Sequence, residues 1–311
     1  TTEIKCIRVQ QTKYKGLNNF VRSTMPLKPL STPVFRVKFN QDNTLVVIAT
    51  VSGFRVYHCD SQTCCYEDSG GVIGLVELLF CTSLLALVGA GQHAAHSPRR
   101  LSLVNAASRA RLADLPFPST ILALALNSTR LVVLLDCKAL VHDLHTLEVT
   151  DTIATPHNPK GVCALSQHRS RNYLALPSCP DSGSVLVQDL DKAQALCQLR
   201  AHNSRLQILA FSPDGSMLAS ASEKGTIVRV HHLPQACKAF TFRRGSYPAT
   251  IHSLCFSPEC IKPPLLSAAS SKGTVHLFCL DSSLGETRAV GDARTLLAAV
   301  LVISLPAIAG V

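Results

Sequence analysis

The stretch FSPDGSMLASASEKGTIVRV, residues 211–230, decides the fold because its pattern recurs along the chain. Residues 256–278, FSPECIKPPLLSAASSKGTVHLF, repeat the same order: a Phe-Ser-Pro turn, an apolar strand, a run of small residues, a Lys-Gly-Thr turn and another strand. A third copy is FNQDNTLVVIATVSGFRVY at 39–57, and weaker copies cover 126–144 and 166–190. An internal repeat of this kind predicts several copies of one supersecondary unit.

The turn glycines give the length of the repeat. Gly225 follows Gly183 by 42 residues, Gly273 follows Gly225 by 48, and Gly53 precedes Gly183 by 130. The longest interval corresponds to three units of about 43 residues, the period of a four-stranded propeller blade. Two further units lie between Gly53 and Gly183, so six blades can be counted. The chain has no tryptophan, so these are divergent blades without the Trp-Asp dipeptide of ordinary WD repeats.

We therefore expect an all-β fold, a β-propeller of WD-type blades, divided into three parts. Residues 1–30 form an extension, 31–281 carry blades one to six, and 282–311 carry the rest. A seventh blade is incomplete, or part of 282–311 joins residues 3–11, which close the ring as a strand and remove exposed sheet edges. The C-terminal run 296–311 is shorter than the roughly 20 apolar residues of a spanning helix, and we expect a buried strand.

Composition narrows the class of partner. The chain is 47% hydrophobic and 16% charged, which excludes disorder throughout. Its net charge of +10 favours a polyanion: nucleic acid, an acidic protein or an anionic membrane. Residues 1–30 lack the apolar core of a signal peptide, so secretion has no support.

The 13 cysteines are scattered, odd in number and mostly within apolar runs. This distribution indicates buried thiols in a reducing compartment rather than a disulfide framework. The nearest approach to a metal motif is Cys59, Cys64 and Cys65 beside His58, but no second pair follows at ligand spacing. We expect neither a metal nor another cofactor.

The segment FTFRRG at 240–245 places two arginines, Arg243 and Arg244, where an apolar strand pattern ends. Side chains alternate in direction along a strand, so we expect the two guanidinium groups on opposite faces. Each neighbouring repeat offers hydroxyls, a glycine turn with exposed backbone N–H groups and basic side chains. Together these suit a phosphate monoester better than a carboxylate or a base edge, and they predict two phosphate sites.

A structural interpretation of the same residues stays open. Ser220, Ser222 and their counterparts are small strand residues in any propeller, and Thr226 and Thr274 form turns. His202 lies where a WD-type blade often uses a histidine for a structural hydrogen bond. Alternation could turn the side chain of His276 to either face.

Taken together, FRRG, the preceding LASASEKGT (218–226) and the following SSKGTVHLF (270–278) resemble the PROPPIN family, the WIPI-type phosphoinositide-binding β-propellers of autophagy. SPRRLSLVN (97–105) and NPKGVCALS (158–166) are also similar to the corresponding blades, and the resemblance extends over roughly 35–280. It implies a seven-bladed propeller that binds phosphatidylinositol 3-phosphate and phosphatidylinositol 3,5-bisphosphate through two pockets flanking the Phe-Arg-Arg-Gly motif.

Carried over residue by residue, the resemblance implies a first pocket of His202, Ser220, Ser222, Gly225, Thr226, Arg229 and Arg243. The second pocket it implies consists of Arg244, Ser271, Thr274 and His276. The family also inserts an apolar loop of its sixth blade into the bilayer, which here begins after Leu280. The remaining residues are too few for both that loop and a complete seventh blade.

The resemblance further implies a monomer, cytoplasmic and peripheral on preautophagosomal and endosomal or vacuolar membranes. It implies partners among the autophagy proteins, including the lipid-transfer protein of autophagosome growth. The alternative is a generic WD-type protein-interaction scaffold without lipid specificity, which would be favoured if Arg243 and Arg244 were paired with carboxylates. RNA binding lacks aromatic stacking platforms, so we expect no nucleic acid. An enzyme lacks a recognisable nucleophile, base and orienting acid.

Overall fold

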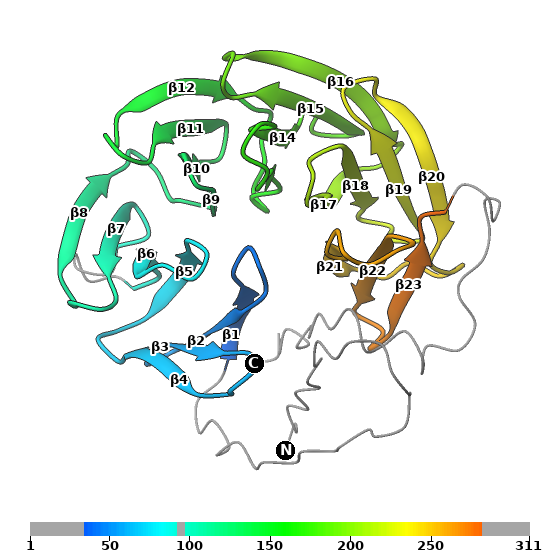
Figure 1. Cartoon of the computed structure of the whole chain (residues 1–311). Helices are drawn as coiled ribbons and strands as arrows, with labels where there is room; N and C mark the ends of the chain where they lie inside the picture. The colour runs from blue at the N-terminus through cyan, green and yellow to red at the C-terminus, as the bar shows by residue number, and fades with distance from the viewer. Residues whose placement is uncertain (1–33, 92–96, 282–311) are drawn as a thin grey trace.

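The computed structural model describes residues 34–91 and 97–281, and these residues form an all-β propeller. Six antiparallel sheets are arranged as blades around a central axis (Figure 1). The predicted all-β class and the six countable blades are confirmed. The expected seventh blade, the closing strand at 3–11, the insertion loop and the strand at 296–311 lie outside the described residues. The three-part division of the chain stays a prediction.

The first three blades each contain four strands in chain order. Blade one consists of β1 (Val34–Phe39), β2 (Leu45–Thr50), β3 (Gly53–His58) and β4 (Cys64–Asp68). Blade two consists of β5 (Ile73–Leu78), β6 (Leu84–Gly89), β7 (Arg100–Asn105) and β8 (Arg111–Pro116). Blade three consists of β9 (Ala123–Leu126), β10 (Arg130–Leu134), β11 (Lys138–Asp143) and β12 (Val149–Ala154).

Blades four and five again have four strands, and blade six has three in the described part of the chain. Blade four consists of β13 (Ala164–Leu165), β14 (Tyr173–Pro177), β15 (Gly183–Asp189) and β16 (Gln194–His202). Blade five consists of β17 (Leu206–Phe211), β18 (Met217–Ser222), β19 (Ile227–His232) and β20 (Cys237–Arg243). Blade six consists of β21 (Ile251–Phe256), β22 (Leu265–Ser270) and β23 (Val275–Cys279).

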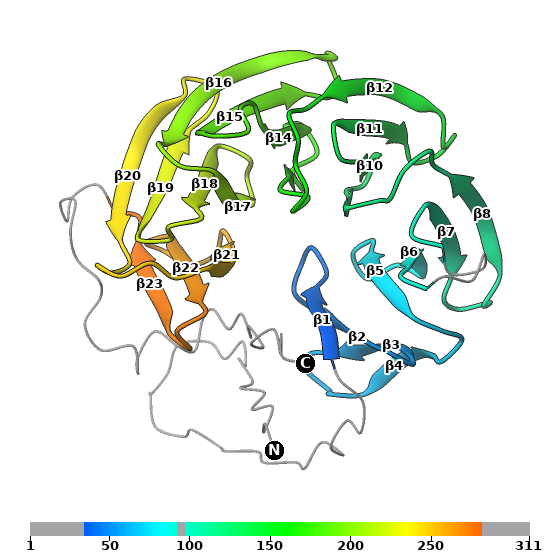
Figure 2. The same cartoon turned by 180° about the vertical axis from the view of Figure 1, so that it is seen from behind.

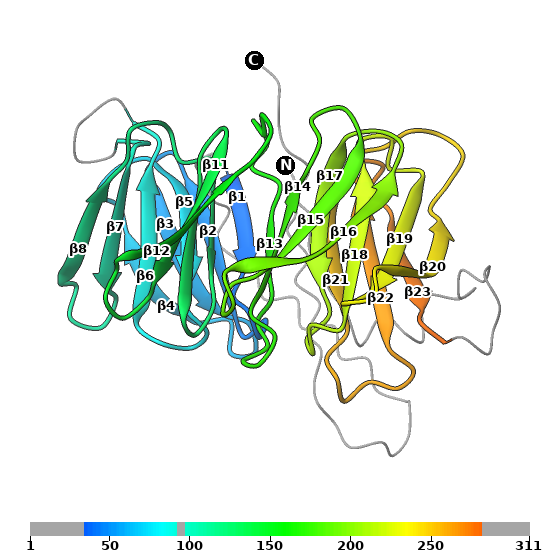
Figure 3. The same ribbon diagram turned by 90° about the horizontal axis from the view of Figure 1, so that it is seen from above.

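Within each blade the chain moves outward from the axis. The first strands, such as β1, β5 and β17, lie near the centre, and the fourth strands, such as β8 and β20, lie at the rim (Figures 1 and 2). Figure 3, seen from above, shows the strands running roughly along the axis. This arrangement brings each blade face to face with the next.

The hydrophobic core lies between blades rather than at one centre. One apolar cluster joins Val56 of β3 to Leu85 of β6, and another joins Val230 of β19 to Phe256 of β21. Both faces of a middle strand are therefore covered, and all six residues of β22 are buried. Burial on both faces explains why the second strands are continuous apolar or small-residue runs instead of alternating ones.

A buried polar side chain closes the turn between the first and second strands of several blades. Ser212 Oγ accepts the Met217 N–H at 2.9 Å, and Ser257 Oγ accepts the Leu265 N–H at 2.9 Å. In blade one the carboxamide oxygen of Asn40 accepts the Leu45 N–H at 3.0 Å. The Phe-Ser-Pro and Phe-Asn repeats thus have a physical cause, because a buried backbone donor needs a partner.

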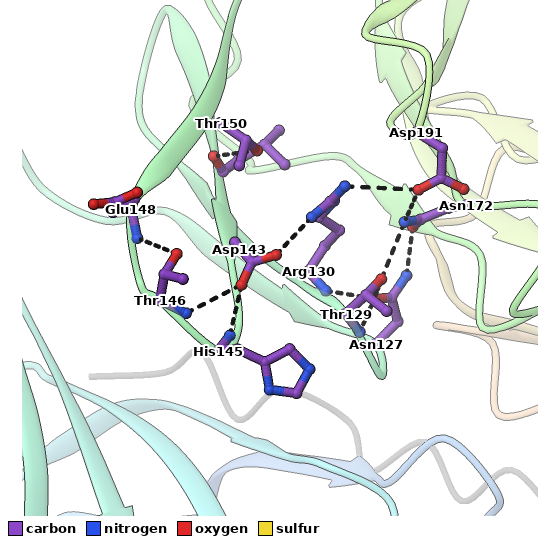
Figure 4. A network of polar contacts seen from close by, with 11 residues as sticks. Asn127, Thr129, Arg130, Asp143, His145, Thr146, Glu148, Thr150, Asn172 and Asp191 are labelled. Carbon is purple, nitrogen blue, oxygen red and sulfur yellow. Dashed lines mark hydrogen bonds and ion pairs between the residues drawn. The ribbon is translucent and has the colours of Figure 1, made fainter.

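Asn127 has this role in blade three and also connects to blade four (Figure 4). Its carboxamide oxygen accepts the Arg130 N–H at 2.8 Å, while Nδ2 donates to the Ser166 carbonyl at 3.0 Å and to Asn172 Oδ1 at 2.8 Å. Arg130 pairs with Asp143 of its own blade at 3.0 Å and lies 3.7 Å from Asp191 of the next. The network therefore fixes one blade against its neighbour.

The glycine turns of blades five and six differ in their surroundings. Gly225 has a φ of 57°, and a Cβ there would lie 1.8 Å from the Ala249 carbonyl oxygen. Gly273 has a φ of 71°, but a Cβ at this position would meet no atom within 4 Å. Both turns use the left-handed conformation that favours glycine, and Gly225 also allows close approach of the backbone that follows β20.

The expectation of buried thiols was wrong for half of the cysteines in the described ranges. Exposed thiols belong to Cys64, Cys65, Cys81, Cys137, Cys237 and Cys260, and the other six are partly buried. The exposed ones lie on outer strands, as at the starts of β4 and β20, or in turns. An apolar run in the sequence does not show which strand of a blade faces solvent.

Replacing Asn127 by Ala should destabilise the protein by about 3 kcal/mol, because buried donors and acceptors lose their partners. Urea unfolding measures the change. The control is Arg111→Ala, which breaks an exposed ion pair with Asp114 and should change the unfolding free energy by less than about 0.5 kcal/mol. Similar losses in the two variants would contradict the cross-blade role.

The two glycines provide a matched pair. Gly273→Ala should cost about 1 kcal/mol, the strain of a left-handed non-glycine residue. Gly225→Ala should cost at least about 3 kcal/mol, because its Cβ also displaces backbone. Unfolding in urea distinguishes the two, and equal losses would show that the contact with Ala249 has no energetic weight.

Candidate functional site

The alternation along β20 separates the two faces of blade five. Phe242 stacks on Phe278 of blade six with ring centroids 4.6 Å apart, so its face is turned toward blade six. On β18, Leu218 packs with Val185 and Leu199 of blade four, so the opposite face is turned toward blade four. Blade five therefore takes part in two junctions, one on each side.

Strand register assigns the polar residues to these junctions. Ser220, two residues after Leu218, pairs with Arg229 on β19, which pairs with Thr241 on β20. Arg243 is two residues after Thr241, and so lies on the blade four face with Ser220 and Arg229. Arg244 follows on the Phe242 side, and its charge acts on His276 of blade six. The two arginines thus diverge, as the strand period predicts.

The junction of blades four and five brings His202, Ser220 and Arg229 together. His202 ends β16 and is buried, and its Nε2 lies 3.1 Å from Ser220 Oγ. The Arg229 guanidinium donates to the Ala201 carbonyl. Burial, with a smaller contribution from the charge of Arg229, lowers the pKa of His202 to about 4. The imidazole is neutral at pH 7, so the fixed positive charge here comes from arginine.

The β18–β19 turn holds the other predicted members of the first pocket. Ser222 is buried, and its carbonyl accepts the Gly225 N–H at 2.8 Å. The Gly225 carbonyl accepts from Arg244 Nε at 2.7 Å, and the Thr226 carbonyl accepts the Arg244 N–H at 2.9 Å. Arg244 is therefore anchored on the turn of the first pocket, and the two sets of residues meet there.

The expected exposed glycine N–H groups are not free. Gly225 donates within its own turn, and Gly273 donates to the Ser270 carbonyl at 3.0 Å. The expectation was wrong because a turn of this length closes on itself by an internal hydrogen bond. Side chains, rather than the backbone N–H groups of the glycines, would therefore contact an anion at these turns.

The junction of blades five and six holds the second predicted set. Ser271 and Thr274 are exposed; Thr274 Oγ1 lies 3.0 Å from Ser270 Oγ, and Ser271 Oγ accepts the Thr250 N–H at 3.2 Å. Burial and then the Arg244 charge lower the pKa of His276, while an interaction with the Arg244 backbone opposes them. His276 Nδ1 is buried without a hydrogen-bond partner among the described residues.

Register shows that His276 is the counterpart of Arg229. Ser220 pairs with Arg229 in blade five, and Ala268, at the same point of its strand, pairs with His276. Between the last paired residues of the second and third strands lie residues 222–227 in blade five and residues 270–274 in blade six, so the connection in blade six is one residue shorter. Counting residues from Gly225 and Gly273 does not align Arg229 with His276. Only the strand pairing shows that the two are equivalent.

Neither arginine of the pair has a carboxylate partner in the part of the chain that the structure describes. Arg243 is exposed and donates to Ser246 Oγ at 3.4 Å, and Arg244 donates to the carbonyls of Gly225 and Tyr247. Nearby cationic side chains do have carboxylate partners: Arg205 pairs with Asp181 at 2.8 Å, and Lys160 pairs with Glu223 at 2.7 Å. Two guanidinium groups therefore keep their charge available.

The weak metal motif at His58, Cys59, Cys64 and Cys65 is not gathered into a ligand set. In the described ranges the ligand atoms of Asp136, Cys137 and His157 lie within 4.8 Å of one another. His157 Nδ1 is 2.7 Å from Asp136 Oδ1. These residues come from two loops, and sequence spacing did not predict their proximity.

The loop after β20 was not predicted to belong to the site. Ser246 and Tyr247 contact the two arginines, and the signal available for them was the turn composition Gly-Ser-Tyr-Pro at 245–248. That composition predicts a turn but not which side chains bond within it.

Comparison with known proteins agrees with the fold and with the family resemblance. The PROPPIN family profile matches residues 34–291. Autophagy-related protein 18b of Arabidopsis thaliana is 42% identical over 260 residues, covering 84% of this chain and 71% of that protein.

Two solved structures have the same architecture. Hsv2 of Kluyvelomyces marxianus superposes with a TM-score of 0.71 at 21% identity, covering 82% of this chain and 79% of the other. KlAtg21, solved in complex with the coiled-coil of AgAtg16, also gives 0.71, at 28% identity and with 81% of this chain and 82% of the other covered. With its matched profile and its curated relative, this chain belongs to the PROPPIN family of autophagy-related, phosphoinositide-binding β-propellers.

Proposed function

We propose that this protein is a non-enzymatic effector that binds phosphatidylinositol 3-phosphate and phosphatidylinositol 3,5-bisphosphate and recruits autophagy proteins to membranes. One headgroup pocket lies at the junction of blades four and five, with His202, Ser220, Ser222, Gly225, Thr226, Arg229 and Arg243. The other lies at the junction of blades five and six, with Arg244, Ser271, Thr274 and His276.

The observation that carries the proposal is the absence of carboxylate partners for Arg243 and Arg244 among the described residues. A generic scaffold that neutralised these arginines would pair them with acids, as the propeller does for Arg205. Guanidinium groups bind phosphate with paired, charge-assisted hydrogen bonds. Hydroxyls from Ser271 and Thr274 add short-range contacts that a diffuse basic surface lacks.

Two pockets on one rigid body support stable recruitment. Binding of a second headgroup is effectively intramolecular once the first is held, so two weak sites give strong avidity. Each basic residue close to an anionic bilayer contributes about 1 kcal/mol. Because both pockets belong to blade five and its neighbours, the propeller meets the membrane at this part of its rim.

Partners and location follow from the same proposal. KlAtg21 was solved with a coiled-coil of AgAtg16, which supports partners among the autophagy proteins. We propose that these partners include the lipid-transfer protein of autophagosome growth and that they bind blades away from the pockets. We place the monomer in the cytoplasm, peripheral on preautophagosomal and endosomal or vacuolar membranes. No helix in the described ranges is both long and apolar enough to span a bilayer.

Replacing Arg243 and Arg244 together by Thr should abolish flotation with vesicles that contain phosphatidylinositol 3-phosphate. Each single replacement should leave partial binding, because one pocket survives. Thermal unfolding of Arg243→Thr should change little, since Arg243 is exposed and makes only a long contact with Ser246, whereas Arg244→Thr also loses the hydrogen bonds to the Gly225 and Tyr247 carbonyls. A single variant as weak as the double would indicate one shared site.

The matched control removes the same charge elsewhere. Arg109 and Arg111 are both exposed in blade two, and their joint replacement by Thr should leave most vesicle binding intact. If this control floats as poorly as the Arg243 and Arg244 double variant, net charge rather than two pockets governs binding.

Salt should weaken vesicle binding but preserve lipid selectivity. Exposed charges are screened over about 8 Å at physiological ionic strength, whereas contacts inside a pocket are screened much less. The measurement is flotation across a salt series with phosphatidylinositol 3-phosphate and with phosphatidylserine at matched vesicle charge. Selectivity that disappears together with affinity would reduce the pockets to a nonspecific basic surface.

A further inference from the structure

Tyr247 is the most exposed large hydrophobic residue in the described ranges, at 81% relative accessibility. It lies in the loop directly after Arg243 and Arg244, between Ser246 and Pro248, which are also exposed. Large aromatic rings normally contribute 150–250 Å² of buried surface. A ring left this far in water, while Phe242 and Phe278 stack on each other between blades five and six, points to a second surface that covers it.

The loop is held in place rather than free. The Gly245 N–H lies 3.4 Å from the Thr226 carbonyl and the Ala249 N–H donates to the Lys224 carbonyl at 3.1 Å, so both ends are tied to the β18–β19 turn. Arg244 donates to the Tyr247 carbonyl itself. Pro248 further restricts the backbone of the preceding residue. The exposed ring is therefore presented on a fixed support.

The surroundings of the ring show what kind of surface fits. The two unpaired guanidinium groups lie within four residues of it, which favours an anionic partner. Cations beside an exposed tyrosine match the boundary between anionic headgroups and acyl chains, where tyrosine is enriched.

We propose that Tyr247 is an interfacial anchor, whose ring enters the headgroup–acyl boundary of an anionic bilayer while Arg243 and Arg244 hold headgroups. The inference rests on the proposed lipid binding and adds a contact with the bilayer itself. The phenol has an apolar ring and a polar hydroxyl, so it bridges the two chemistries of that boundary. Soluble headgroups provide no such boundary and do not use the anchor.

The chain contains no tryptophan, so Tyr247→Trp introduces a single tryptophan, which can be excited selectively, at the site. With vesicles of phosphatidylcholine and phosphatidylinositol 3-phosphate, its emission should shift to the blue and be quenched by brominated acyl chains. The matched control is Leu112→Trp, at an exposed position on β8, across the ring from β20 (Figures 1 and 2). The control should show neither change.

Affinity measurements separate the anchor from the pockets. Tyr247→Ala should bind these vesicles about five-fold more weakly, because the ring no longer leaves water. Tyr247→Phe, which keeps the ring, should stay within about two-fold of the parent protein. Binding of soluble inositol 1,3-bisphosphate should be unchanged in both, because Arg244 uses the backbone carbonyl of residue 247, which every substitution retains.

Three outcomes overturn the inference. If the Tyr247→Trp variant binds the vesicles but its tryptophan emission does not change, the ring stays in water. Equal vesicle affinity of Tyr247→Ala and the parent shows that the ring contributes nothing. Failure of the parent protein to bind phosphoinositide vesicles removes the proposed function and the anchor together, whereas the first two outcomes leave the proposed function standing.

Discussion

The two-residue period of strand β20 is the constraint on which the candidate site depends. Because adjacent side chains on a strand point to opposite faces, one dipeptide supplies a guanidinium group to each side of blade five. Arg243 follows Thr241 toward blade four, and Arg244 follows Phe242 toward blade six. A shift of one residue in the register of β20 would reverse both arginines and place Phe242 on the wrong face.

The propeller makes this divergence useful because its core lies between blades. Apolar contacts such as Phe242 with Phe278 fix neighbouring blades against each other. Polar residues at the ends of the same strands therefore meet across a junction instead of pointing into open solvent. His202 and Ser220 come from different blades and lie 3.1 Å apart. The same packing that stabilises the ring positions the groups that we assign to headgroups.

The contacts of Arg243 and Arg244 differ from those of the ion-paired cations in the described ranges. Most ion pairs in the described ranges are exposed or half-buried pairs that contribute little individually. The arginine pair instead donates to a hydroxyl and to backbone carbonyls. These contacts orient the guanidinium groups without neutralising them. The neutral His202 adds hydrogen bonding without a further charge, which limits repulsion within the first junction.

The sequence by itself determined the repeat, the six blades, the family and the opposite directions of Arg243 and Arg244. Period and alternation are local properties of the chain, so they can be predicted without knowledge of the neighbours. The tertiary structure alone decided that Arg229 and His276 are counterparts, that Gly225 and Gly273 use their N–H groups internally, and which cysteines are exposed. It also decided that both arginines lack carboxylate partners in the described ranges. These properties depend on pairing between residues far apart in the chain, which strand register and blade packing set and a linear pattern does not contain.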